Sequence, residues 1–144
     1  MSAQMEIRIA NRIPEIEQVC EKIEDFGKSI GLDQKFIFAL HLALDEILTN
    51  IISYGYDDKK THEIIVNLAI DKGSLVMEIE DDAHPFNPDQ APQPDLDTPL
   101  QQRKIGGLGI YLVRNLMDSL RYESSHGKNK LTLMKQIKND DASN

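Results

Sequence analysis

A carboxylate and a carboxamide stand four residues apart in the most apolar stretch of the chain. They are Glu46 and Asn50, in a stretch from 36 to 54 where Asp45 and Glu46 are the only formally charged residues. In a helix, positions four apart point to the same side. Burying an unsatisfied polar group costs roughly 2–7 kcal/mol, so these two side chains must bond to each other, line a cleft or hold an ion.

A third polar group, Asp81, ends a β-rich run. Positions 75, 77 and 79 of this run are apolar. The period of two in a strand puts Asp81 on that apolar face and Asp82 on the opposite face. We therefore expect Asp81 at the mouth of the core, where a ligand can reach it.

A glycine-rich turn, Gly106-Gly107-Leu108-Gly109, precedes a helical pattern that extends to about Asp118. Backbone N–H groups at a helix start converge on anions, and the helix dipole favours negative charge there. The turn is therefore a candidate anion site, although glycines also serve plain turns. The sequence contains neither a Walker-type phosphate loop nor the strand that a Rossmann unit requires before such glycines.

Two further helices are predicted before these motifs. The first begins at Pro14, keeps its apolar residues at helical spacing and stops at Gly31. The second is nearly all apolar, is capped by Asp33 and ends at about Tyr54, before Gly55. Because it carries Glu46 and Asn50, this second helix is the element that positions the candidate site.

Strand patterns account for the rest of the regular structure. The first strand is short and terminal, so we expect it at a sheet edge, where it can pair with another copy. The grouping of helices and strands predicts an α+β two-layer sandwich, with a mixed, largely antiparallel sheet of about five strands covered by three helices. The predicted strands cover residues 5–9, 62–70, 75–81, 119–124 and 131–137, with tight turns at 71–74 and 126–129.

Length and composition fit one domain. A chain of 144 residues with 40% apolar content suits a single core, which we expect over about 5–137. Five of the six prolines fall within 85–105. We predict that this segment is a long irregular loop acting as a lid, with a tolerated insertion as the alternative.

Charge and composition also exclude several functions. The net charge of −8 disfavours nucleic acid and anionic membranes as partners. We find no apolar run of about 18 residues and no signal-peptide pattern, and therefore expect a cytoplasmic protein without a membrane-spanning helix. The single cysteine and four histidines show no ligand spacing, which argues against a structural metal.

The order and spacing of these motifs resemble the Bergerat ATP-binding fold of gyrase, histidine kinases and MutL. The resemblance covers about residues 12–137. Within that superfamily the chain is most similar to bacterial anti-sigma-factor serine kinases of the partner-switching type. The stretches that carry the similarity are ALDEILTN at 43–50, DDAHPFNP at 81–88 and GGLGIYLV at 106–113.

The resemblance implies that the protein uses ATP and Mg²⁺. Asn50 would ligate the Mg²⁺ that bridges the phosphates, a role that suits a neutral oxygen on a rigid helix. Glu46 would be the general base that takes the proton from a substrate hydroxyl. Asp81 would accept a hydrogen bond from the adenine amino group.

Phosphate contacts are implied at both ends of the glycine turn. Arg103 and Lys104, at the end of the predicted lid, are candidates for phosphate contact, with ordinary solvated charges as the alternative. The residues whose backbone N–H groups would bind phosphate are Gly107, Leu108 and Gly109. Together with Mg²⁺, this set is sufficient for phosphoryl transfer, which needs mainly positioning and charge neutralisation.

Two positions depart from the family pattern. Ala83 stands where the motif usually has glycine, and alanine adds a methyl group and does not easily adopt a positive φ. The usual threonine of the last strands has no clean counterpart, because spacing puts Asn129 or Lys130 there, and we do not carry its role to Thr132. We therefore expect altered recognition of the base.

The resemblance implies a protein serine/threonine kinase that phosphorylates a small anti-sigma-factor antagonist and alternately sequesters a sigma factor, and it suggests a homodimer. Two alternatives stay open. One is an ATP-binding switch module without significant kinase activity. The other is a histidine-kinase-like catalytic domain acting in trans, which is disfavoured because we find neither dimerisation helices nor a phosphoacceptor histidine.

Overall fold

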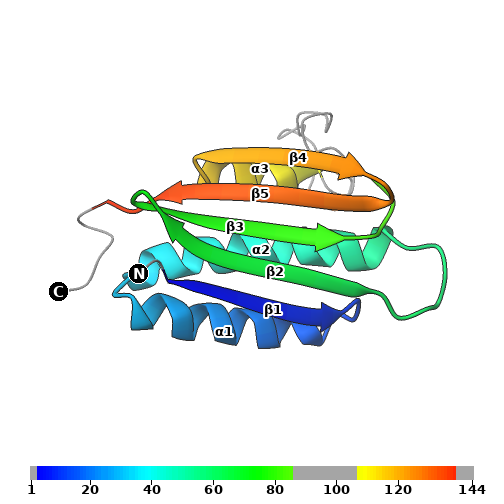
Figure 1. Cartoon of the computed structure of the whole chain (residues 1–144), viewed down its shortest axis with the longest axis horizontal. Coiled ribbons are helices and arrows are strands. Elements are labelled where there is room, and N and C mark those ends of the chain that lie inside the picture. Colours follow the sequence, from blue (N-terminus) through cyan, green and yellow to red (C-terminus); the bar gives the residue numbers. More distant parts are fainter. Residues whose placement is uncertain (1–2, 86–106, 139–144) are drawn as a thin grey trace.

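A computed structural model describes residues 3–85 and 107–138, with the backbone alone described at 107–110 (Figure 1). In chain order, its elements are β1 (Gln4–Ala10), α1 (Glu15–Ser29), α2 (Gln34–Tyr54), β2 (Glu63–Asp71), β3 (Ser74–Asp81), α3 (Gly107–Leu116), β4 (Ser119–Ser125) and β5 (Lys128–Gln136). The elements predicted from the sequence are confirmed in type and order. The predicted lid at 85–105 lies almost entirely outside the described residues.

The five strands form one sheet in the order β1-β2-β3-β5-β4. All four pairings are antiparallel, so the prediction of a mixed sheet is wrong for the described strands. The reason is the position of β5. β3 and β4 run in the same direction and are joined through α3, but β5 lies between them and pairs with both. The prediction that β1 lies at an edge is confirmed.

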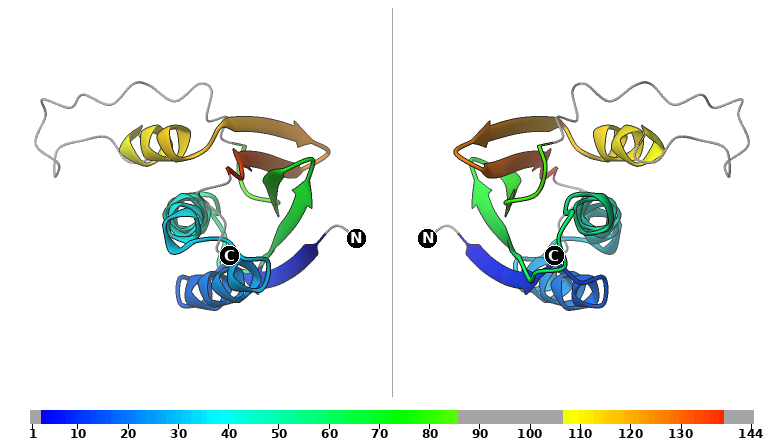
Figure 2. Two further views of the ribbon diagram at one scale, coloured as in Figure 1. Left: turned by 90° about the vertical axis from the view of Figure 1, so that its left-hand side faces the viewer. Right: turned by 90° about the vertical axis from the view of Figure 1, so that its right-hand side faces the viewer.

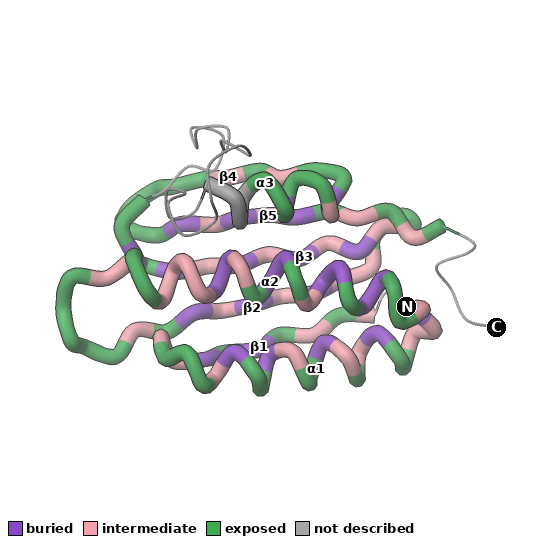
Figure 3. Tube along the Cα trace, turned by 180° about the vertical axis from the view of Figure 1, so that it is seen from behind, coloured by how far each residue is buried: buried purple, intermediate pink, exposed green. Residues whose placement is uncertain are grey.

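The three helices all lie on one face of the sheet (Figure 2). α2 lies in the middle of this layer and contacts both α1 and α3. Viewed from behind, buried residues recur at intervals among exposed ones along α1 and α2, as expected for helices with one covered side (Figure 3). The two-layer α+β sandwich predicted from the sequence is therefore confirmed.

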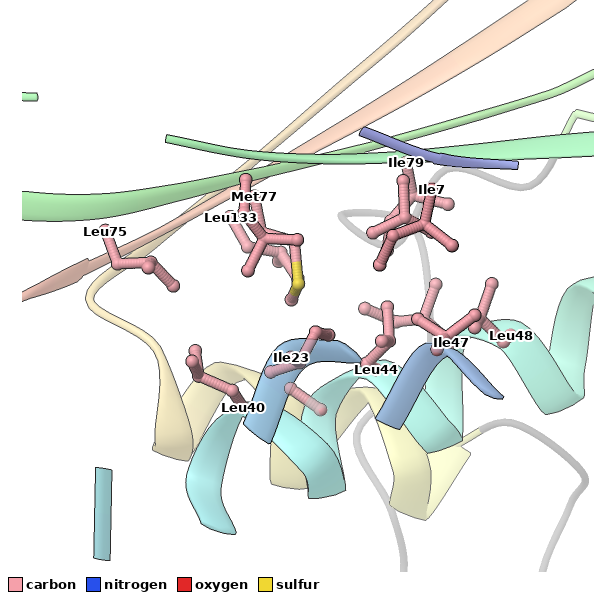
Figure 4. Close-up of a cluster of buried hydrophobic side chains, with 14 of the residues drawn as sticks. Ile7, Ile23, Leu40, Leu44, Ile47, Leu48, Leu75, Met77, Ile79 and Leu133 are labelled. Atoms are coloured by element: carbon pink, nitrogen blue, oxygen red, sulfur yellow. The ribbon is translucent and has the colours of Figure 1, made fainter. Parts of the chain in front are cut away.

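The core fills the space between the sheet and the helices (Figure 4). Strand residues of one parity point into it, as the alternating burial of β3 shows. Each fully buried Leu, Ile or Met side chain stabilises the fold by about 1.5–3 kcal/mol. The side chains labelled in this cluster are Ile7, Ile23, Leu40, Leu44, Ile47, Leu48, Leu75, Met77, Ile79 and Leu133.

Residues between the first two helices determine where α1 ends and where α2 begins. Gly31 has φ 80°, a left-handed conformation that favours glycine, and it ends α1 as predicted. The Asp33 side chain then accepts a hydrogen bond of 2.8 Å from the Phe36 N–H and caps α2. The start of the site-bearing helix is therefore set by the sequence around Asp33.

Two hairpin turns join neighbouring strands. Lys72 and Gly73 both have positive φ, as a two-residue turn between β2 and β3 requires. His126 and Gly127 do the same between β4 and β5. The second turn is shorter than predicted, because Asn129, which we placed in the turn, lies on β5.

The length and mean hydropathy of α2 alone would suit a helix that crosses a membrane. Eight of its residues, however, are buried among the other elements of this fold. The core helix of a globular domain passes the same test of length and hydropathy. The apolar side chains on its other side, Phe38 and Leu42 among them, are exposed.

Candidate active site

Glu46 and Asn50 lie side by side on α2. The Asn50 Nδ2 donates to Glu46 Oε1 at 3.4 Å, near the long limit for a hydrogen bond. Both side chains are only partly buried. The pair therefore satisfies part of its own polar capacity and stays open to a ligand.

The same hydrogen bond orients the Asn50 amide. An ionised carboxylate only accepts hydrogen bonds, so the NH₂ group of Asn50 must face Glu46. Its oxygen then faces away from Glu46, and no described residue donates a hydrogen bond to that oxygen. A neutral carbonyl oxygen of this kind is a ligand that Mg²⁺ accepts.

Asp81 lies at the end of β3 on the covered face, as the strand parity predicts. The residue is only 8% exposed. Its Oδ1 accepts one hydrogen bond from the Ala83 N–H at 2.9 Å and a second from Asn129 Nδ2 at 2.8 Å. Burial raises the pKa of the Asp81 carboxyl, and the bonds from Asn129 and Ala83 oppose that rise.

Asn129 is a buried polar residue whose role the sequence did not reveal. It is 4% exposed and lies opposite Asp81 in the β3–β5 register. Besides its bond to Asp81, its Nδ2 donates to the Ala83 carbonyl at 2.8 Å. Its Oδ1 accepts from Tyr122 Oη at 3.0 Å and from Ser124 Oγ at 2.8 Å. Its parity, the same as that of buried Leu131, is the signal that could have identified it.

The structure shows how Ala83 is accommodated. The only described non-glycine residues with positive φ lie in the two hairpin turns, so Ala83 has no left-handed strain. Its methyl group packs against Gly55, where an added Cβ would lie 2.6 Å from the Ala83 Cβ. The Gly55 carbonyl also accepts from the His84 N–H at 2.8 Å.

Gly55 ends α2 at the predicted position but for a different reason. Its φ is −85°, which any residue can adopt, so a left-handed stop is not what requires glycine. The requirement is space, because an added Cβ would lie 2.5 Å from the Ile51 carbonyl oxygen and 2.6 Å from the Ala83 Cβ in the segment after β3. α2 and the end of β3 are thereby held together beside Asp81.

A cluster of histidine and aspartate side chains surrounds this end of β3. Asp82, on the face opposite Asp81, bonds to His62 Nδ1 at 3.0 Å, and Asp58 bonds to His62 Nε2 at 2.8 Å. Hydrogen bonds to Asp82 and then Asp58 raise the pKa of His62. Tyr56 stacks on His62, and its buried hydroxyl has no described hydrogen-bond partner. The loop between α2 and β2 is thus tied to the strand end.

The glycine turn forms the first residues of α3. Gly107, Leu108 and Gly109 open the helix, so their N–H groups have no carbonyl partner within it. α3 leads into Ser119, which pairs with Met134 at the end of the sheet far from Asp81. The start of α3 therefore faces the Asp81 end, as Figure 1 also shows. Arg103 and Lys104 lie outside the described residues.

Three of the predicted groups thus share one end of the molecule. The C-terminal half of α2 carries Glu46 and Asn50, Asp81 ends β3, and the backbone donors open α3. Side chains that could accept a hydrogen bond or hold a cation, and backbone donors that could bind an anion, would together suit a nucleotide. Residues 9–135 of the chain match the family model of the histidine kinase-like ATPase domain.

The chain belongs to this family. It is 33% identical over 96 residues to a protein of Bordetella bronchiseptica named serine/threonine-protein kinase BtrW, a match that covers 67% of this chain and 68% of that protein. It is 32% identical over 93 residues to the serine-protein kinase RsbW of Bacillus subtilis, covering 61% of this chain and 58% of that protein. The predicted resemblance to anti-sigma-factor kinases of this ATPase fold is therefore confirmed.

A solved structure extends the comparison to the fold. A structure containing the RsbU and RsbW domains of a Mycobacterium tuberculosis protein matches 94% of this chain with a TM-score of 0.70 at 17% identity. The match spans 32% of that longer chain. At this identity the likeness concerns the fold.

Proposed function

We propose that the protein is an ATP- and Mg²⁺-dependent serine/threonine kinase and anti-sigma factor. The observation that carries the proposal is the Glu46–Asn50 pair, half-buried and joined by one long hydrogen bond. A structural pair inside a core would be closed to solvent and fully bonded. A pair that stays open can serve a ligand.

Each residue of the pair has a role in the proposed transfer. Glu46 accepts the proton of the attacking serine or threonine hydroxyl, as a general base within hydrogen-bond reach must. Asn50 holds Mg²⁺ through its amide oxygen and keeps Glu46 oriented through its Nδ2. Bound Mg²⁺ neutralises charge on the phosphates.

The two ends of the nucleotide are assigned to the other groups. Asp81, at the end of β3, accepts a hydrogen bond from the adenine amino group. The N–H groups of Gly107, Leu108 and Gly109 bind phosphate at the start of α3. Arg103 and Lys104 are kept as candidate phosphate contacts.

The proposed partners are a small anti-sigma-factor antagonist as the phosphorylated substrate and a sigma factor as the sequestered protein. The names of the relatives support a kinase, and the net charge of −8 suits action through proteins instead of nucleic acid. We also propose a cytoplasmic homodimer, because β1 is an edge strand among the described strands of the sheet and such an edge can pair with another copy.

The test is a transfer assay with labelled ATP, Mg²⁺ and a panel of small antagonist domains. We expect label on a serine or threonine with the wild type, and loss of transfer with Glu46→Ala or Asn50→Ala. Asp45→Ala is the matched control, because Asp45 is an exposed acid on the same helix. It should transfer label like the wild type.

The other outcomes separate the alternatives. Binding of ATP without transfer to any candidate would favour the ATP-binding switch module. Label on a histidine of a partner would favour a histidine-kinase-like domain acting in trans. Failure to bind ATP at millimolar concentration would refute the proposal and both alternatives.

A further inference from the structure

We infer that Asn129 is a positioning residue for nucleotide recognition, which fixes the carboxylate of Asp81 so that one of its oxygens is presented to the base. The inference rests on the proposed function, because it assigns the residue that prepares the proposed adenine acceptor. Asn129 stands where the family pattern has no clean match in this chain. Its role therefore has to be derived from its contacts.

The contacts of Asn129 use its whole hydrogen-bonding capacity. A carboxamide has two N–H donors and two acceptor lone pairs. Its Nδ2 donates to Asp81 Oδ1 and to the Ala83 carbonyl, both at 2.8 Å. Its Oδ1 accepts from the Tyr122 and Ser124 hydroxyls. Asn129 has no donor left for a ligand, so it acts on recognition only through Asp81 and Ala83.

As a consequence, the two carboxylate oxygens of Asp81 differ in their hydrogen bonding. Oδ1 takes both hydrogen bonds, one from Asn129 and one from the Ala83 N–H. No described residue donates to Oδ2. The carboxylate is thereby fixed in its plane with one acceptor left over. Such an acceptor suits the amino group of adenine and repels the carbonyl oxygen that guanine has at that place.

The two departures from the family pattern belong to one network. Ala83 gives Asp81 a backbone donor and gives Asn129 a backbone acceptor. Its methyl group is admitted because Gly55 has no side chain. Asn129 therefore fixes the acid and the segment after it at once, and the two unusual residues support the same geometry.

A pH profile separates this role from a merely structural one. Removing the Asn129 donors takes away an interaction that opposes the burial-driven rise in the pKa of Asp81. The variant should then need a higher pH to keep Asp81 ionised and able to bind the amino group. The other charged or titratable groups near Asp81 are Tyr56, Asp82 and Lys128, and they are the same in wild type and variant.

The experiment measures ATP and GTP dissociation constants by calorimetry between pH 5.5 and 8.5 for the wild type and Asn129→Leu. Leucine is of similar size but has neither amide donors nor a charge of its own that would shift the pKa of Asp81. We expect ATP binding at pH 7 to weaken on the order of ten- to a hundredfold. We also expect the pH below which binding is lost to move upward and the preference for ATP over GTP to shrink. Asn67→Leu, the same change on the open face of β2, should leave all three unchanged.

The outcomes are distinct. If the wild type fails to bind ATP, the proposed function falls and the inference falls with it. If the wild type binds and Asn129→Leu weakens binding at all pH values equally, with ATP and GTP alike, the residue is structural and the inference is overturned. If Asn129→Leu does not fold, Ser124→Ala is the deciding variant. That variant removes one hydrogen bond that orients Asn129. The pH below which ATP binding is lost should then move upward, by less than when Asn129 itself is replaced, whereas an unchanged pH would overturn the inference.

Discussion

Replacing Gly55 with alanine should destabilise the protein through its contact with Ala83. A Cβ at this position would lie 2.6 Å from the Ala83 Cβ and 2.5 Å from the Ile51 carbonyl oxygen. Both distances are shorter than folded proteins tolerate, and neither neighbour is a flexible side-chain end. Forcing an extra methyl into such a place costs about 1–3 kcal/mol of the free energy of unfolding.

The contact with Ala83 makes the prediction sharper, because it can be removed separately. Ala83→Gly alone should cost about 1–2 kcal/mol, the sum of one lost buried methyl and the greater chain entropy of glycine. In the double variant, the contact at 2.6 Å is gone, while the contact with the Ile51 oxygen remains. The combined cost should therefore be smaller than the sum of the single costs, by at least about 0.5 kcal/mol.

Urea unfolding of the four proteins, followed by circular dichroism, measures this coupling. The slope against urea should stay constant, so that midpoints report stability alone. Gly73→Ala is a useful control, because Gly73 has φ +79° and no atom within 4 Å of an added Cβ. Its cost is strain only, and it should add to that of Ala83→Gly. Additivity of Gly55→Ala and Ala83→Gly within about 0.3 kcal/mol would refute the packing argument.

Two more predictions concern the elements around the site. Asp33→Ala removes the side-chain acceptor for the Phe36 N–H and should cost about 0.5–2 kcal/mol in urea unfolding, whereas Asp33→Asn should cost less. The hydrogen bonds of His62 to Asp82 and Asp58 raise the pKa of His62. Its contribution to the free energy of unfolding is therefore complete below about pH 6.5 and is lost as the pH rises through the raised pKa. Thermal melting of His62→Gln should accordingly fall below wild type most at acidic pH, and an equal difference at all pH values would contradict this.

Periodicity and capping made much of the site predictable from the sequence. The period of two along β3 assigned Asp81 to the covered face, and the structure buries it there. The spacing of four residues along α2 predicted that Glu46 lies beside Asn50, and the two side chains are hydrogen-bonded. These features depend on the local geometry of a strand or a helix, which can be inferred from a single sequence.

The features that were missed depend on contacts between distant segments. The sheet was expected to be mixed because nothing local shows that β5 inserts between β3 and β4. Asn129 was assigned to a turn because glycine and polar residues precede it, and only its pairing with Asp81 reveals its role. Gly55 was taken as a helix stop, although part of what requires glycine there is the close approach of Ala83, which is distant in sequence.

The central claim is that Glu46 acts as a base beside a nucleotide that it does not itself bind. The most direct test is to measure the ATP dissociation constant and the single-turnover rate of transfer for Glu46→Gln, which keeps size and removes the basic oxygen. We predict an unchanged dissociation constant and a transfer rate lower by about 10²–10⁴-fold. Unchanged transfer, or a loss of transfer fully explained by lost ATP binding, would contradict the claim.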